Sequence, residues 1–391
     1  METWGYSDDK LRGLGAFHTA KEIYRQPQVW NKIFESIVAS KAQIQSFLVE
    51  ATRHEKFQIV LTGAGSSAFI GLSLKGVYSR SFGRFCTSVS TTHLVTHPLD
   101  YLSPGIPVLL ISFARSGNSP ESIAAARITD QICSKVYHLI ITCDGSGKLA
   151  NFKTDSDKYV FVLPPEANDQ SLAMTGSYSG MLLAGLLIAR LGEIEYLARQ
   201  VEILDSYATK LLIRYVNDFR EIASLDFIRA VFLGSGPLFG TATESQLKLQ
   251  ELTDGQIICK RDSFLGFRHG PKAVIDERTL VFYLFSNQPY VLQYEKDLVE
   301  SMKNGKRPLY QVGLMETTNF HLNFDKAIIL SEDGNHLEED FLPVCSIIPA
   351  QMLGFFKCLQ IGLKPDSPSA SGAISRVVKG VVIYPYNSSN R

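Results

Sequence analysis

Short apolar runs alternate with helical patterns along most of the chain. Residues 57–78 have the pattern of an apolar strand, a glycine-rich turn and a helix. Residues 108–127 repeat this order with a polar loop as the turn, and residues 138–150 add a third strand that ends at Asp-Gly. Strands and helices that alternate at this spacing predict parallel sheets covered by helices on both faces, with ligands at the carboxyl ends of the strands.

The glycine-rich unit recurs 171 positions later in the chain. Gly63 corresponds to Gly234, the strand at 108–113 corresponds to the strand at 279–285, and Ser116 corresponds to Asn287. Self-similarity at a fixed offset is the sequence signature of a duplicated unit. The fold class that we expect is therefore α/β, with two tandem domains built on parallel sheets.

The length of 391 residues also favours two domains, because one hydrophobic core rarely organises so long a chain. We expect an N-terminal helical arm over residues 1–50, a first domain over 51–205 and a second over 206–391. The boundary is placed in a helical stretch near residue 205. Near the end of the chain, a loop rich in Pro, Ser and Gly is expected to precede a last strand at 377–385.

Composition excludes several classes of function. Lys plus Arg and Asp plus Glu each number 39, so no net charge favours nucleic acid as a partner. No secretory signal is visible at the N-terminus, and the longest apolar run, 181–189, is too short to span a membrane and predicts a buried helix. The six cysteines form no C-x-x-C pair, which is typical of reduced thiols in a cytosolic protein. They are Cys86, Cys133, Cys143, Cys259, Cys345 and Cys358.

A serine-rich loop between a strand and a helix is the first candidate anion site. Residues 112–122 combine four hydroxyls, a glycine and Arg115, and the following helix should add partial positive charge at its N-terminus. An ordinary helix cap at Ser119, with spare serines, is the alternative. The equivalent loop in the second half, 285–288, has lost most of these groups, and this asymmetry favours a functional role for the first.

The glycine-rich turn at 62–67 is the second candidate. It lacks the third glycine of a dinucleotide fingerprint, because Ala68 stands there, and it lacks the lysine of a nucleotide P-loop. A short phosphate ester therefore fits this turn better than a nucleotide. The alternative is that its glycines serve only close packing of strand and helix.

Acid–base chemistry has candidates in the second half. Glu244, Lys248 and Glu251 fall on one face of a predicted helix, where a carboxylate could move a proton and a cation could stabilise an enediol-like intermediate. A solvated, salt-bridged surface is the alternative. His269, between an arginine and a Gly-Pro turn, is suited to proton transfer near neutral pH and could open a sugar ring. His93 and His97 have no acidic helper nearby, so we expect structural roles and no metal site.

Several motifs resemble the sugar isomerase (SIS) domain superfamily, and nearly the whole chain resembles its AgaS-type subgroup. Each glycine-rich motif alone is common, whereas the set together is specific. This resemblance implies that each domain is a three-layer αβα sandwich of the flavodoxin-like kind. The motifs are TAKEIYRQPQVW (19–30), LTGAGSSAFIG (61–71), SFARSGNSPES (112–122), NDQSLAMTGSYSGM (168–181), ELTDGQIICKRDSFLGFRHGPKAVID (251–276) and LKPDSPSASGAISRVVKGV (363–381).

The resemblance also implies roles for residues. Glucosamine-6-phosphate synthases carry a related isomerase half in which a lysine precedes a catalytic glutamate by three residues and a histidine follows before Gly-Pro. Lys248, Glu251 and His269 hold those places here, although two extra residues separate the glutamate from the histidine and Ala114 replaces a hydroxyl of the phosphate loop. The remaining roles implied are phosphate binding by Ser67, Arg115, Ser116 and Ser119, and sugar binding by Ser66, Thr175 and Arg376.

An activity follows from the resemblance as an expectation: conversion of galactosamine 6-phosphate to tagatose 6-phosphate and ammonia, with no metal or organic cofactor. In the related family the histidine comes from the neighbouring subunit, which implies a homodimer or homotetramer with a shared active site. Synthesis from glutamine is not expected, because no glutaminase unit precedes the isomerase unit. Two alternatives remain, a tagatose-6-phosphate ketose/aldose isomerase that releases no ammonia and a sugar-phosphate-binding regulator without activity.

Overall fold

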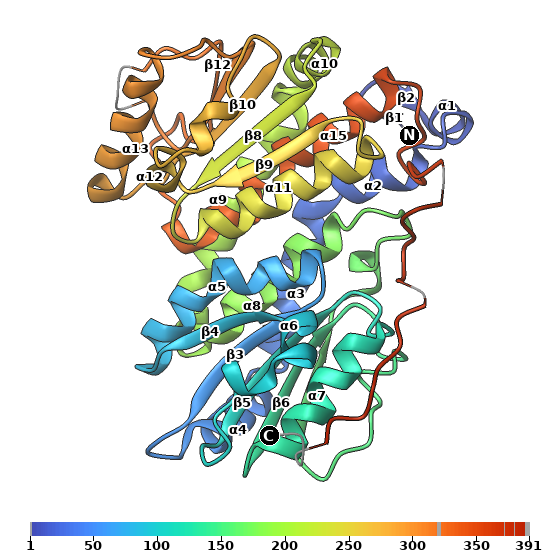
Figure 1. Ribbon diagram of the computed structural model, residues 1–391, viewed down its shortest axis with the longest axis vertical. Coiled ribbons are helices and arrows are strands. Elements are labelled where there is room, and N and C mark those ends of the chain that lie inside the picture. The colour runs from blue at the N-terminus through green and yellow to red at the C-terminus, as the bar shows by residue number, and fades with distance from the viewer. Residues whose placement is uncertain (1, 319–321, 371, 379, 388–391) are drawn as a thin grey trace.

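Two parallel β-sheets, one above the other in Figure 1, organise the chain. The computed structural model describes residues 2–318, 322–370, 372–378 and 380–387. The first sheet has the order β4-β3-β5-β6-β7, with strands β3 (Gln58–Gly63), β4 (Cys86–Ser90), β5 (Val108–Ala114), β6 (Val136–Thr142) and β7 (Asp157–Val162). The second has the order β9-β8-β10-β11-β12, with strands β8 (Arg229–Gly234), β9 (Ile258–Asp262), β10 (Thr279–Leu284), β11 (Tyr310–Met315) and β12 (Lys326–Ile329). The strand order is thus the same in both sheets.

Helices pack on both faces of each sheet. An N-terminal helical region precedes the first sheet, as the sequence predicts, and also holds the short strands β1 (Glu2–Thr3) and β2 (Tyr6–Ser7). Its helices are α1 (Asp8–Gly13), α2 (Phe17–Tyr24), α3 (Gln26–Ala39) and α4 (Lys41–Thr52). Helices α5 (Ser66–Phe82), α6 (Thr91–Thr96), α7 (Pro120–Ile132), α8 (Gly176–Ala189), α9 (Ile194–Arg214) and α10 (Val216–Ser224) follow. The second half adds α11 (Leu238–Leu252), α12 (Phe264–Phe267), α13 (Pro289–Met302), α14 (Leu342–Ser346) and α15 (Ile348–Gln360).

Side-chain alternation along the strands produces these layers. In β3, Leu61 packs in the large core shared with α5 and α8, whereas its neighbour Val60 packs on the other face with residues of α6 and α7. Phe232 and Val231 of β8 divide between the two faces of the second sheet in the same way. Strands buried on both faces carry nearly continuous apolar runs, which is why the sequence identifies them.

The structure confirms the duplication at equivalent glycines. Gly65 and Gly236, which are 171 positions apart, both adopt positive φ, +57° and +54°. A Cβ on Gly63 would lie 2.5 Å from the backbone of Ser67, and a Cβ on Gly234 would lie 2.5 Å from the carbonyl oxygen of Leu238. Each strand therefore turns tightly into its helix, and only glycine fits there.

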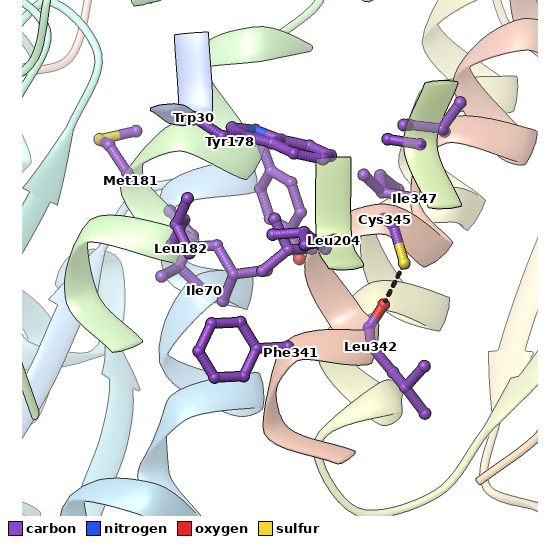
Figure 2. Packing of buried hydrophobic residues seen from close by; sticks show 14 of the residues in the cluster. Trp30, Ile70, Tyr178, Met181, Leu182, Leu204, Phe341, Leu342, Cys345 and Ile347 are labelled. Carbon is purple, nitrogen blue, oxygen red and sulfur yellow. Dashed lines mark hydrogen bonds between the residues drawn. The ribbon is translucent and has the colours of Figure 1, made fainter. Parts of the chain in front are cut away.

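One continuous core joins the two halves. Helices α8, α9 and α15 contribute to it, and Figure 2 shows Trp30 and Tyr178 beside Phe341 and Cys345 in this region. Helix α8, predicted as a buried helix from its apolar run, has no exposed residue. The apolar segment Glu339–Gln360 is long enough to cross a membrane, but 94% of its most apolar window is buried inside the protein, so it is a core element.

The C-terminal segment corrects one prediction. No strand occurs at 377–378 or 380–385, and residue 379 lies outside the described residues. The tail runs past loops and α7 of the first half in Figure 1, and none of its described residues belongs to a sheet. The apolar residues that predict a strand pack elsewhere, because Val377 and Val378 line one cavity and Ile383 lines another. The expected boundary near residue 205 falls within helix α9.

Candidate active site

A cavity of about 610 Å³ lies at the carboxyl ends of β3 and β5. This is where parallel α/β sheets bind ligands, because two helix N-termini face outward from the sheet there. Segments distant in sequence form its walls. They are the glycine-rich turn 64–67, the loop residues between β5 and α7, Leu172 and Met174, one face of α11, and the tail 372–378.

The glycine-rich turn brings the N-terminus of α5 to the cavity. The positive φ of Gly65 directs the chain into the helix, and Ser66 and Ser67 are both buried at its first turn. Neither serine caps the helix, and residues 64–67 of this turn line the cavity. Such a helix start favours an anionic ligand.

The serine-rich loop brings the N-terminus of α7 to the same cavity. Ser119 is the N-cap residue, but its hydroxyl makes no capping hydrogen bond and instead lies 2.6 Å from the hydroxyl of Ser122. Ser116 Oγ accepts a hydrogen bond from the backbone N–H of Asn118. The ordinary helix cap considered from sequence is therefore not what the structure shows. The two helix starts and their serines form a site suited to a phosphate.

Helix α11 presents acid–base groups to this cavity. Lys248 Nζ lies 2.6 Å from Glu251 Oε2 and 3.3 Å from Glu244 Oε1. The side chains of Lys248 and Glu244 have no exposed surface, whereas Glu251 keeps 23% of its side chain exposed. The alternative interpretation, in which these three side chains form a solvated, salt-bridged surface, is therefore wrong. Lys248 and Glu251 line the cavity, and Glu244 lies behind them.

Burial and charge shift the pKa values of this group. Burial raises the pKa of Glu244 to about 7, although the nearby ammonium of Lys248 acts in the opposite direction. Burial alone would lower the pKa of Lys248, but the carboxylates of Glu244 and Glu251 outweigh it and raise that pKa. Lys248 thus stays cationic, and Glu251 is the one of the two carboxylates that can meet a ligand.

His269 and Thr175 are not among the residues that line this cavity. His269 is exposed on the loop that follows α12. Thr175 is fully buried, and its side-chain and backbone donors bond to the carboxylate of Asp169. One chain therefore brings the serines, Lys248 and Glu251 together, but not the histidine.

Arg115 and Arg376 line the cavity through bonds to the chain itself. The guanidinium of Arg115 donates to the carbonyl oxygens of Leu172 and Arg376, at 3.0 and 2.6 Å. Arg376 donates to the carbonyl oxygen of Asp169 and the side chain of Asn168. Burial lowers the pKa of Arg115, and the nearby Asp169 carboxylate opposes this effect.

Several lining residues were not predicted individually. Ser122 lies in the predicted loop, and its spacing of three from Ser119 was the signal that could have identified it. The other residues are mostly apolar and carry no chemical signal, since they reach the cavity only through the fold. They are Phe113, Leu172, Met174, Leu247, Ile374, Val377 and Val378. Among the described residues, no group of three or more His, Cys, Asp or Glu side chains is arranged to hold a metal ion.

Comparison with known proteins places the chain in a family. Residues 53–191 match the SIS domain. The D-galactosamine-6-phosphate deaminase AgaS of Shewanella sp. (strain ANA-3) is 39% identical over 97% of this chain and 95% of its own length. A glutamine–fructose-6-phosphate aminotransferase of Pyrococcus horikoshii is 25% identical, and the alignment covers 89% of this chain but 56% of that protein.

Solved structures agree with this placement. A crystal structure from Clostridium novyi NT, proposed to be a tagatose-6-phosphate ketose/aldose isomerase, is 39% identical, covers 99% of this chain and all of its own, and has a TM-score of 0.95. The tagatose-6-phosphate ketose/aldose isomerase of Escherichia coli is 34% identical over 95% of this chain and 97% of its own, with a TM-score of 0.85. The chain therefore belongs to the AgaS family of sugar-phosphate deaminases and isomerases, within the SIS domain proteins.

Proposed function

We propose that this protein converts D-galactosamine 6-phosphate to D-tagatose 6-phosphate and ammonia. The observation that carries the proposal is the buried Lys248–Glu251 pair, which faces the same cavity as two serine-bearing helix N-termini. A phosphate held at the helix starts would place the sugar carbons toward α11. The AgaS deaminase of Shewanella, 39% identical over nearly its full length, supports this substrate.

Phosphate binding falls to Ser67, Ser116 and Ser119 in this proposal, with Ser66 near the sugar. Their hydroxyls and the neighbouring N–H groups can donate to phosphate oxygens, and the two helix N-termini add favourable potential. Thr175 would act indirectly, because its hydroxyl is bonded to Asp169 and shapes the loop whose Met174 lines the cavity.

The reaction then needs one base and one nearby cation. In the open-chain aldehyde, Glu251 removes the proton from carbon 2, and the developing negative charge on the carbon 1 oxygen is stabilised by the ammonium of Lys248. When Glu251 returns the proton to carbon 1, the electron pair of the amino nitrogen forms the carbon 2–nitrogen double bond and one proton of that nitrogen passes to the carbon 1 oxygen. Carbon 1 thus becomes an alcohol and carbon 2 becomes a ketimine. Water adds to the ketimine and ammonia leaves, which gives the ketose phosphate.

Ring opening requires a further proton donor and acceptor, for which we propose His269. Because His269 is exposed and lies outside its own chain's cavity, it would act in the cavity of a second copy of the chain. The site would then be complete only in a homodimer or larger oligomer. A cytosolic location is part of the same proposal and is supported by the six free cysteines, five of them buried.

Ammonia release tests the proposal directly. The purified protein is offered galactosamine 6-phosphate and glucosamine 6-phosphate in parallel, and ammonia and tagatose 6-phosphate are measured. We expect ammonia from the galacto sugar, and a loss of roughly 10³-fold or more in kcat for Glu251→Gln, with binding of the phosphate ester retained. Unchanged turnover in the variant would remove Glu251 from the mechanism.

The second candidate is a ketose/aldose isomerase that acts on tagatose 6-phosphate without releasing ammonia. The E. coli structure of that description, 34% identical to this chain, favours it. The same base and phosphate site would serve both reactions, so their geometry does not distinguish them. Isomerisation of tagatose 6-phosphate together with no ammonia from either amino sugar would establish the second candidate.

A further inference from the structure

The C-terminal tail forms one wall of the active-site cavity although no strand or helix holds it. Residues 372–378 line the cavity opposite α11, and the residues before them are fastened to the N-terminal region. There the carboxylate of Asp366 accepts hydrogen bonds from the backbone N–H and the hydroxyl of Thr19, at 2.7 and 2.8 Å. The chain is thus held at Asp366, and the position of residues 372–378 depends on contacts made further along the tail.

Arg115 and Arg376 make hydrogen bonds that link the tail to neighbouring loops. Arg115 Nη2, from the loop after β5, donates to the carbonyl oxygen of Arg376 at 2.6 Å, while Arg376 Nε donates to the carbonyl oxygen of Asp169 at 3.0 Å. Arg115 Nη1 donates to the carbonyl oxygen of Leu172 at 3.0 Å. Arg115 therefore joins three segments of the wall, its own phosphate loop, the loop 168–174 and the tail.

The loop 168–174 is itself firmly held, so it can serve as an anchor. Asp169 accepts hydrogen bonds from the backbone N–H groups of Thr175 and Ser177, at 2.7 and 2.9 Å. Glu22 of α2 accepts from the backbone N–H of Gln170 and the hydroxyl of Ser171. Through the bonds of Arg115 and Arg376, the tail is linked to both of the other segments.

We propose that Arg115 is a positioning residue that fastens the tail 372–378 over the sugar, and that it does not act as a ligand of the substrate phosphate. Arg115 is buried, and both of its terminal nitrogens already bond backbone carbonyl oxygens of the chain. The fastened tail shields the reacting carbons from bulk water and fixes the apolar wall made by Ile374, Val377 and Val378. This inference deepens the proposed function and rests on it for the identity of the sugar.

Replacement by lysine distinguishes fastening from phosphate binding. Lysine keeps the positive charge that a phosphate would need, but it cannot bridge the carbonyl oxygens of Leu172 and Arg376 as a planar guanidinium does. We expect Arg115→Lys and Arg115→Ala to reduce kcat/KM by similar factors, about 10-fold to 100-fold. Near-normal activity of Arg115→Lys beside a large loss in Arg115→Ala would overturn the proposal.

Hydrogen exchange of the free protein gives a readout that does not depend on the substrate. Peptides covering 372–378 should exchange faster in Arg115→Lys, Arg115→Ala and Arg376→Ala than in the unchanged protein, and Arg199→Ala, which removes an exposed arginine from α9, should leave them unchanged. Arg376→Ala alters a partly exposed tail residue and should fold even where a change at Arg115 does not. Unchanged exchange in the Arg115 and Arg376 variants would disprove the fastening, whereas faster exchange with no ammonia from any sugar would contradict only the proposed function.

The two arginines should also act as one unit. If both arginines hold the tail together, the activity of the double variant Arg115→Ala/Arg376→Ala should lie within about threefold of the activity of the less active single variant. Multiplicative losses would show two independent roles and contradict the proposal. Thermal unfolding of each variant shows whether any loss reflects global instability instead.

Discussion

The carboxyl edges of the two sheets occupy equivalent places in the duplicated fold, but the loops at the two edges have different partners. At the first edge, the loop after β5 and the start of α7 contribute Ser116, Ser119 and Ser122 to the lining of a cavity of about 610 Å³. At the second edge, the loop after β10 is bonded to glutamates of its own chain. The backbone N–H of Ser286 donates to Glu295 at 2.9 Å, and its hydroxyl bonds Glu339.

Loop length and one helix position account for much of this difference. Five residues separate Ala114 from Pro120 at the first edge, and four separate Leu284 from Pro289 at the second. Counted from these prolines, the seventh residue is Ala126 in α7 and Glu295 in α13. The second half thus has the carboxylate of Glu295 where the first half has the small side chain of Ala126. That carboxylate accepts the hydrogen bond of the Ser286 N–H, which an anion could otherwise accept.

The packed helices α5 and α11, which lie between the sheets, also give the two edges different side chains. A Cβ on Gly240 of α11 would lie 2.2 Å from the hydroxyl of Ser73 in α5, so the two helices are in close contact. Helix α11 gives the first edge Lys248 and Glu251, whereas α5 gives the second edge Arg80, which bonds Asp340. Duplication therefore yields one site built from both halves, with phosphate groups from the first and acid–base groups from the second.

Removal of the cation from each edge should produce the largest contrast. Lys248→Met should reduce kcat by about 10²-fold to 10³-fold, because no other cation of α11 lies at the reacting carbons to stabilise the developing charge. Arg80→Met removes the exposed cation at the second edge and should change kcat less than about twofold. Steady-state kinetics with galactosamine 6-phosphate measure both.

Thermal unfolding must accompany this pair, since Lys248→Met leaves two carboxylates without their ammonium. The raised pKa of Glu244, about 7, allows that side chain to take up a proton and limits the cost. An equal loss of kcat in both variants would mean that the second edge also takes part in catalysis, and the comparison would fail.

Removal of one hydroxyl from each loop should give a smaller contrast. Ser119→Ala should raise KM for the sugar phosphate about 10-fold, since a hydrogen bond to a charged group is worth about 1.5–3 kcal/mol. Ser286→Ala breaks the bond to Glu339 and should affect stability without changing KM. A KM effect at Ser286 as large as that at Ser119 would place substrate at both edges.

Patterns local in sequence predicted the fold and the serines of the first edge. The strands carry apolar runs because both faces are buried, and Gly63 and Gly234 mark turns that need no distant partner. The family, the tandem sheets and the N-terminal helical region are confirmed. The division at residue 205 and the role of each site residue stay predictions.

Contacts between segments distant in the chain could not be predicted from the sequence. Arg115 was expected at the phosphate because it lies in the serine-rich loop, yet in the structure it donates a hydrogen bond to a carbonyl oxygen 261 positions away. The tail was predicted as a strand from its apolar residues at 377–385, since the sequence does not show whether a segment joins a sheet. The glutamates that bond the loop of the second edge, Glu295 and Glu339, come from α13 and from a short 3-10 helix after β12, and no local motif links them.

The smallest expected effect concerns Glu295, whose side chain fills the second edge. Burial raises its pKa from an ordinary 4.5 to about 8, so the folded protein binds a proton there that the unfolded chain releases. The free energy of unfolding should therefore fall as the pH rises from about 4.5 to about 8.

Glu295→Gln can still accept a hydrogen bond from the N–H of Ser286 and carries no charge. Its free energy of unfolding, relative to that of the unchanged protein, should therefore grow through this pH window, to a difference on the order of 2 kcal/mol. Urea unfolding at pH 5.5 and pH 8.5 measures that advantage, with Glu300→Gln, a partly exposed glutamate of the same helix, as the control. Because we propose no substrate binding at the second edge, kcat and KM of Glu295→Gln should stay unchanged. A pH-independent difference in stability would show that folding does not raise the pKa of Glu295.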